Sequence, residues 1–300
     1  MQVHNTLVLN STITKSSNLL TEVEVARAAG FGAMEIHAQK IEQYLQAGYS
    51  KSELSCALRD IPIVGVGFIV DIERQGKARE DLLREATRVF ELAAAVNAGG
   101  VQILTGPVDV QTVIDCREGR FTGGGYRDLL RLPEDQLLAV AARNLADLAD
   151  RARDHALCLY LEPLSWAALN GLEKPLSLIE AAARTNVKLV IDYWHCFTSG
   201  VSPEELARLD KELIYGVHVC DSLAFSGGVP IETELRNVPT GQGVLDLKEW
   251  TDAVKATGYR GWWAAETFSR KMQQQPLYTI ARDMRRLLET LVADKVGSAP

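Results

Sequence analysis

Four side chains of the kinds that bind metal ions stand at or near the carboxyl ends of four successive apolar segments. They are Glu162 in YLEPL, Asp192 in VIDYWH, His218 in GVHVCD and Glu266 in AAETF. Burying an unpaired charge is costly, and three converging carboxylates repel one another unless a positive charge lies among them. The set therefore predicts one divalent cation. Oxygen and imidazole ligands suit Mn²⁺, our first choice, or Co²⁺, Mg²⁺ or Zn²⁺.

Each of these residues also has a structural explanation when it is taken alone. Glu162, which precedes a proline, can mark the end of a strand, and Asp192 can cap the turn that follows it. His218 can be a hydrogen-bonded core histidine, and Glu266 can pair with an arginine such as Arg270. Their recurrence on four consecutive segments favours a shared metal site. The absence of cysteine from the set argues against a closed structural zinc site.

Further side chains are expected to contact a substrate at the same place. His195 follows Asp192 by three residues. Its ordinary pKa near neutrality suits proton transfer or the binding of hydroxyl groups, and the alternative is a histidine on a surface loop. Arg236 lies in the glycine-containing segment ELRNVPTGQG and is expected to hold an enolate or hydroxyl oxygen. The remaining candidates are Glu35, His37 and Trp166 for the pocket wall, and Asp221 as an acceptor that orients a metal ligand.

The elements that must position these residues alternate regularly along the chain. Eight apolar segments predict strands at 6–10, 33–37, 63–69, 100–104, 157–162, 188–192, 214–219 and 261–266, with amphipathic helical segments between them. Strands apolar on both faces and separated by helices predict a parallel sheet covered by helices. Eight such units predict an α/β fold, a single (β/α)8 TIM barrel domain over residues 1–300. The alternative, an open doubly wound sheet, usually has a glycine-rich loop after its first strand, and TLVLNSTITKS contains no glycine.

In such a barrel the carboxyl ends of the strands meet at one mouth, where the chemistry lies. The four metal-type residues are therefore expected to meet there. Two long connections, at about 106–133 and 221–245, are expected to border this mouth. Three consecutive glycines, Gly123 to Gly125, predict that the first of them is a mobile lid.

Composition narrows the classes of partner and compartment. A formal net charge of −7 without a basic block argues against a nucleic-acid surface. The five cysteines are odd in number and lack CxxC spacing, which favours a reducing compartment. No signal peptide and no apolar run of about 18 residues is visible, so we expect a cytoplasmic protein without a membrane partner. The oligomeric state stays open, with a homo-oligomer among the alternatives.

The segments LEPL, VIDYWH, VHVCD, RNVPTGQGVLD and AAETF together resemble the xylose isomerase-like TIM barrels, the sugar phosphate isomerase/epimerase superfamily. The resemblance covers nearly the whole chain. Within the superfamily, the sequence is most similar to the inosose (2-keto-myo-inositol) isomerase type. It implies that His195 and Arg236 contact the substrate while the four metal-type residues hold the ion. Ketose 3-epimerases of this superfamily have a substrate-binding glutamate six residues after the first metal ligand. Ala168 occupies that position here, which argues against a ketohexose epimerase.

The resemblance also implies an activity in carbohydrate metabolism, of the kind found in inositol catabolism. An isomerase or epimerase would act on a keto-sugar or keto-inositol through an enediolate, with Glu162 and Glu266 carrying the proton and His195 as a further catalytic candidate. A lyase of the dehydratase or deglycosylase type is the main alternative. A non-catalytic sugar-binding barrel would be expected to have lost a ligand. A DNA endonuclease of this fold would need more than five histidines and a basic face.

Overall fold

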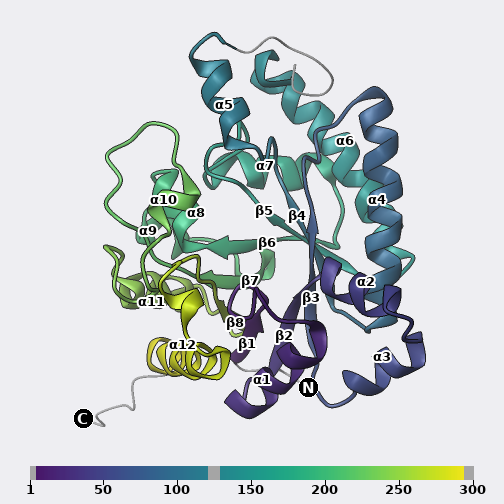
Figure 1. Cartoon of the computed structure of the whole chain (residues 1–300). Coiled ribbons are helices and arrows are strands. Elements are labelled where there is room, and N and C mark those ends of the chain that lie inside the picture. Colours follow the sequence, from purple (N-terminus) through teal and green to yellow (C-terminus); the bar gives the residue numbers. More distant parts are fainter. Residues whose placement is uncertain (1–4, 121–128, 294–300) are drawn as a thin grey trace.

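In the computed structural model, eight parallel strands close into a barrel that is surrounded by helices (Figure 1). The structure describes residues 5–120 and 129–293. Each strand pairs with the next one along the chain, and the last pairs with the first. The strands are β1 (Thr6–Asn10), β2 (Ala33–His37), β3 (Ile63–Ile69), β4 (Gly100–Leu104), β5 (Cys158–Glu162), β6 (Val187–Asp192), β7 (Ile214–Val219) and β8 (Trp262–Ala265). The predicted TIM barrel is confirmed.

Most of the longer helices cover the outside of the barrel, whereas the helix at Val110–Arg117 and the shorter ones lie in the connections. The longer ones are α1 (Leu19–Ala29), α2 (Ala38–Gln46), α3 (Lys51–Ala57), α4 (Gly76–Ala95), α5 (Val110–Arg117), α6 (Glu134–Arg153), α7 (Glu173–Ala182), α11 (Leu247–Ala256) and α12 (Leu277–Val292). The shorter ones are α8 (Tyr193–Thr198), α9 (Pro203–Leu206), η2 (Lys211–Leu213), α10 (Glu232–Leu235) and η3 (Met272–Gln274). The last helix, α12, packs against α1 and so completes the outer layer (Figure 1).

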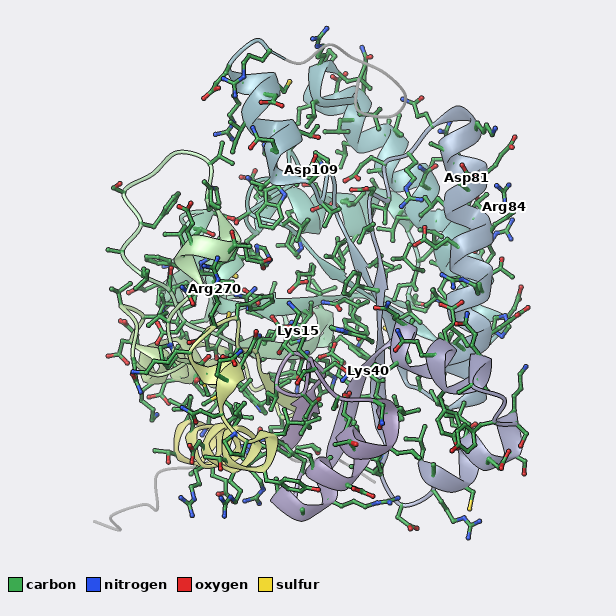
Figure 2. All side chains as sticks on the ribbon, viewed as in Figure 1. Lys15, Lys40, Asp81, Arg84, Asp109 and Arg270 are labelled. Atoms are coloured by element: carbon green, nitrogen blue, oxygen red, sulfur yellow. The ribbon has the colours of Figure 1, made fainter. Side chains whose placement is uncertain are left out.

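The long helices of the outer layer bury one face and expose the other. In α6 the buried residues recur every three or four positions, as in Leu137, Ala141, Leu145 and Leu148. Charged side chains of the outer face, such as Asp81 and Arg84 of α4, point away from the barrel, whereas Lys15 lies over its mouth (Figure 2). The described part of the chain contains no helix with the length and apolarity needed to span a membrane.

Large side chains fill the barrel interior below the mouth. A compact group of buried residues there includes Tyr160 and Trp262. Two glycines make room for these rings. A Cβ atom at Gly65 would lie 2.0 Å from the Tyr160 hydroxyl, and one at Gly216 would lie 1.9 Å from the Trp262 ring. The amino-terminal part of the barrel is therefore packed solid, which restricts a ligand to the carboxyl-terminal end.

The two long connections are more structured than the sequence suggested. The segment 106–133 contains α5, and the segment 221–245 contains α10. The glycine run Gly123 to Gly125, on which the lid prediction rests, lies outside the described residues.

Candidate metal centre and pocket

The side chains of Glu162, Asp192, His218 and Glu266 converge at the carboxyl end of the barrel. One ligand atom from each of them lies within 4.8 Å of the others. Nδ1 of His218 is 3.3 Å from Oε1 of Glu162 and 3.7 Å from Oε1 of Glu266. The strand register explains this convergence, because Asp192 of β6 stands opposite His218 of β7. Glu266 follows β8 directly, and its amide donates to the Val219 carbonyl of β7.

All four residues are buried, and their electrostatics favour a bound cation. Burial raises the pKa of Glu162 to about 7; His218 opposes this rise, and Asp192 and Glu266 add to it. Burial also raises the pKa of Glu266. Burial by itself would lower the pKa of His218, but the surrounding carboxylates, Glu35 first, hold it well above its usual value. A group of acids that attracts protons so strongly fits a divalent cation, which neutralises the same charges.

Glu35 lies beneath His218 and does not line the cavity, contrary to the expectation that it contacts substrate. Its Oε2 is 2.9 Å from Nε2 of His218. The Tyr160 hydroxyl donates to Glu35 Oε1 and the Asn10 amide donates to Oε2, each at 2.7 Å. Side chains two residues apart on a strand share a face, so Glu35 lies roughly 6–7 Å deeper in the barrel than His37. Because Glu35 lies deeper along β2, it is absent from the pocket wall and lies behind His218.

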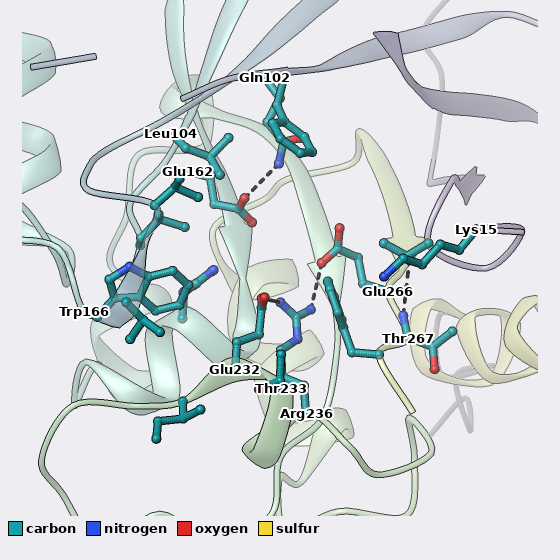
Figure 3. Close-up of a pocket in the computed structure, with 18 of the residues that line it drawn as sticks. Lys15, Gln102, Leu104, Glu162, Trp166, Glu232, Thr233, Arg236, Glu266 and Thr267 are labelled. Carbon is teal, nitrogen blue, oxygen red and sulfur yellow. Dashed lines mark hydrogen bonds and ion pairs between the residues drawn. The ribbon is translucent and has the colours of Figure 1, made fainter. Parts of the chain in front are cut away.

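Gln102 of β4 is a site residue that the sequence reasoning missed. Its amide donates to Oε2 of Glu162 at 2.8 Å, and its side chain lines the cavity (Figure 3). Gly67 of β3 leaves space for it, since a Cβ atom there would lie 2.8 Å from Oε1 of Gln102. The available signal was a single polar residue inside the otherwise apolar strand GVQIL.

Arg236 reaches into the cluster from the end of α10. Its guanidinium donates to Glu266 Oε2 at 2.7 Å and to Asp192 Oδ2 at 3.3 Å (Figure 3 shows the first contact). It also pairs with Glu232 at 3.0 Å and lies over the Phe268 ring, 4.0 Å from the ring centre. Burial by itself would raise the pKa of Asp192, but Arg236 together with His195 and His218 lowers it to about 2. Glu266 therefore pairs with Arg236, and the alternative pairing with Arg270 is wrong.

His195 is buried on the cavity wall, which excludes the alternative of a surface-loop histidine. Asp192 caps the helix α8, because its Oδ1 accepts the amide hydrogen of His195 at 2.8 Å. The aspartate thus serves both as the predicted cap and as part of the cluster. Burial lowers the pKa of His195 to about 4, so the ring is neutral. The amide of Ser165 donates to Nδ1 at 3.1 Å, which assigns the ring proton to Nε2.

Two residues of the cluster, Glu162 and Glu266, line a cavity of about 460 Å³. His37 and Trp166 line it as expected from the sequence. Burial lowers the pKa of His37 to about 4, so this ring is also neutral. The Trp166 indole donates to the Pro107 carbonyl at 2.9 Å and so joins the loops that follow β4 and β5. The wall also includes the apolar side chains Phe68, Leu104, Val108, Val110, Leu164, Ile231 and Phe268.

Asp221 shapes the connection after β7 and shows no contact with the cluster among its described hydrogen bonds. Its carboxylate accepts the amide hydrogens of Gly241 at 3.0 Å, Gly243 at 2.8 Å and Leu245 at 3.2 Å. A Cβ atom at Gly243 would lie 2.2 Å from Asp221 Oδ1, so only glycine fits there. The expectation that Asp221 orients a metal ligand is replaced by a role in folding the loop that carries Arg236.

Comparison with known proteins gives a family and several relatives at low identity. The family model described as xylose isomerase-like TIM barrel matches residues 23–291. A 3-dehydroshikimate dehydratase of Pseudomonas aeruginosa is 27% identical over 282 residues, which are 93% of this chain and 40% of that protein. The chain therefore spans about two fifths of the length of that relative. An inosose isomerase of Bacillus velezensis is 24% identical over 264 residues, 86% of each chain.

Solved structures share the fold. A crystal structure of the IolI protein with a zinc atom superposes with a TM-score of 0.82 at 19% identity and covers 96% of this chain and 98% of that one. A D-psicose 3-epimerase determined in the presence of D-fructose superposes with a TM-score of 0.71 at 15% identity, covering 96% of this chain and 99% of that one.

Proposed function

The chain belongs to the xylose isomerase-like TIM barrel family, and from this premise we propose that it is a divalent-metal-dependent isomerase or epimerase of a keto-sugar or keto-inositol. The observation that carries the proposal is the convergence of three carboxylates and one imidazole, of which Glu162 and Glu266 line a cavity of about 460 Å³. Cavities of roughly 300–1,000 Å³ are typical of small-molecule sites.

We assign Glu162, Asp192, His218 and Glu266 as the residues that hold the metal ion. Their oxygen and imidazole donors suit Mn²⁺ first, with Co²⁺, Mg²⁺ and Zn²⁺ as alternatives. The zinc atom bound in the IolI structure supports the assignment of a metal ion to this chain. A bound divalent cation supplies a Lewis acid that stabilises negative charge on a substrate carbonyl oxygen.

Proton transfer is assigned to Glu162 and Glu266. Both flank His218, and each has its Oε2 atom in contact with a different donor. The neutral amide of Gln102 binds Glu162, whereas the guanidinium of Arg236 binds Glu266. A neutral donor stabilises a carboxylate less than a charged one, so Glu162 is the stronger base of the two. Glu162 therefore takes the proton from the carbon beside the carbonyl, and Glu266 exchanges a proton on the opposite side of the enediolate.

The remaining wall residues position the substrate. His195, protonated on Nε2, donates a hydrogen bond to a substrate hydroxyl or carbonyl oxygen and is the second candidate for proton transfer. Arg236 donates hydrogen bonds to two carboxylates of the cluster and also lines the cavity. Trp166 and the neutral His37 provide the sides against which the carbon skeleton packs.

A lyase of the dehydratase or deglycosylase type is the second candidate function. The relationship to a 3-dehydroshikimate dehydratase favours it, as does the presence of Asp109 and Glu232 on the cavity wall. These acids come from the two long connections, where a lyase would need a group that protonates the leaving oxygen. The first step, removal of the proton beside the carbonyl, is common to both reactions.

Proton exchange in D₂O, followed by NMR, tests the proposal. Metal-loaded enzyme is incubated with ketoses, inososes and 3-dehydroshikimate. Deuterium at the carbon beside the carbonyl with an isomeric product supports the isomerase or epimerase, and loss of water supports the lyase. Chelator-treated enzyme is the control. Tight binding of a sugar without exchange in any compound would instead identify a sugar-binding barrel and overturn the proposal.

A further inference from the structure

Lys15 is a positively charged side chain on the wall of the cavity, in the loop between β1 and α1. Figure 3 shows it on the same side of the pocket as Glu266 and Thr267, with its amino group directed towards the interior. Within residues 5–120 and 129–293, no hydrogen bond or ion pair involves its ammonium group. Its charge is therefore available to a ligand.

Hydrogen bonds hold the backbone that leads to Lys15. The Thr12 amide donates to the Asn10 side chain at 2.8 Å, and the Thr267 amide donates to the Thr12 hydroxyl oxygen at 3.3 Å. The buried ammonium of Lys40 donates to the Thr14 carbonyl at 2.8 Å. These contacts fix the backbone before Lys15, so that its side chain extends into the cavity from a defined point.

The other basic side chains of the described cavity wall are either paired with carboxylates or uncharged. Arg236 is already paired with Asp192, Glu232 and Glu266. His37 is neutral, because burial lowers its pKa to about 4, and Nδ1 of His195 accepts the Ser165 amide hydrogen, so this ring is not an imidazolium. Lys15 thus differs from them in being charged and without a protein partner.

We propose that Lys15 binds an anionic group, a carboxylate or a phosphate, on a substrate whose carbonyl lies at the cluster of Glu162, Asp192, His218 and Glu266. This inference rests on the proposed function and narrows its substrate class to acidic keto-polyols. Two neutral side chains of the cavity are further candidates: the Thr12 hydroxyl hydrogen is free to donate, and Gln273, whose amide donates to the Thr267 carbonyl at 3.1 Å, also lines the cavity. The cavity of about 460 Å³ has room for a six-membered ring together with such a substituent.

Lys15 is an exposed residue of the cavity wall, so its attraction for an anion depends on how far the cavity excludes solvent. A concave, partly apolar site strengthens the attraction between a fixed charge and its ligand compared with open solvent. A lysine that merely extends into water would affect neutral and anionic ligands equally. The comparison of matched ligands that differ in charge therefore separates the two roles.

The test uses two pairs of compounds, D-fructose with D-fructose 6-phosphate and an inosose with 3-dehydroshikimate. Dissociation constants are measured by calorimetry and turnover by NMR, with wild-type protein, Lys15→Met and Lys15→Arg. Lys51→Met, an exposed lysine of α3 outside the cavity, is the matched control. We expect wild type to bind at least one anion more tightly than its neutral partner. Lys15→Met should raise the dissociation constant of that anion by about 10- to 100-fold and change that of the neutral compound by less than about 3-fold.

The outcomes also separate this inference from the proposed function. Lys15→Arg should keep most of the preference, and added salt should reduce it. Comparison of the phosphate pair with the carboxylate pair shows which of the two anionic groups Lys15 binds. Anions bound no more tightly than neutral partners, or equal losses for both, would overturn the role of Lys15 even if turnover is observed. Anion binding that depends on Lys15 without proton exchange would preserve the subsite and refute the enzymatic proposal.

Discussion

Nε2 of His218 lies 2.9 Å from Oε2 of Glu35, and both side chains are buried. This contact leaves Nδ1 of His218 facing Glu162 and Glu266. Tyr160 and Asn10 hold Glu35 in turn. A carboxylate behind a histidine ligand fixes the ring orientation and makes the nitrogen that faces the metal more basic.

Glu35→Gln should therefore weaken metal binding by about 10- to 100-fold. The amide keeps the size of the side chain but removes its charge. Competition with a chelator measures the metal dissociation constant, and thermal unfolding of the metal-free proteins reports structural damage. Tyr160→Phe should have a smaller effect, with Tyr193→Phe, whose hydroxyl contacts Thr251, as its control. An unchanged metal dissociation constant in Glu35→Gln would show that His218 does not need this support.

Glu162→Gln and Glu266→Gln should each retain substrate binding while kcat falls by about 10²- to 10⁴-fold, the usual contribution of general acid–base catalysis. Solvent deuterium exchange should be lost together with turnover. Glu249→Gln on the solvent side of α11 is the control. If both variants keep near-normal exchange, the base lies elsewhere, and His195 is the next candidate.

His218→Ala and His195→Ala should separate metal binding from proton transfer. His218→Ala removes a ligand and should lower both metal occupancy and activity. His195→Ala should keep the metal and lose turnover, because its ring contacts Ser165 and the cavity wall, with no contact to the cluster carboxylates through ring nitrogens. Elemental analysis after dialysis gives the metal content. Equal metal loss in both variants would contradict this division of roles.

Glu73 is expected to make the stability of the fold depend on pH. It is 2% exposed, and its carboxylate accepts the Gly106 amide hydrogen at 2.9 Å. Burial raises the pKa of Glu73 from 4.5 to about 7 despite this bond. The folded state therefore binds the proton more tightly than the unfolded state. Its stabilising contribution is complete below pH 4.5 and is lost as the pH rises through about 7.

Glu73→Gln removes this titration and keeps an oxygen that accepts from Gly106. The variant should be more stable than wild type at pH 8, by up to about 3 kcal/mol, and the difference should shrink towards pH 4.5. Urea unfolding at several pH values measures it, with Glu91→Gln, at an exposed position of α4, as the control. A constant difference across this pH range would mean that Glu73 does not titrate as expected.

Local sequence patterns were sufficient for the fold. All eight strands lie within two residues of the predicted ranges, since apolar segments buried on both faces must form the inner sheet. The same patterns located the cluster, because acids and a histidine at the ends of such strands stand out from their apolar surroundings. Asp192 and His218 meet because they end adjacent strands, and adjacency follows from chain order in a barrel.

Depth along the barrel and side-chain pairing were decided only by the tertiary structure. Glu35 and His37 share one strand and one face, yet the first lies behind His218 and the second lines the cavity. Which residues of different strands lie at the same level depends on the stagger of the closed sheet, a property of all eight strands together. For the same reason no local pattern shows that Gln102 binds Glu162, or that Arg236 is neutralised while Lys15 is not.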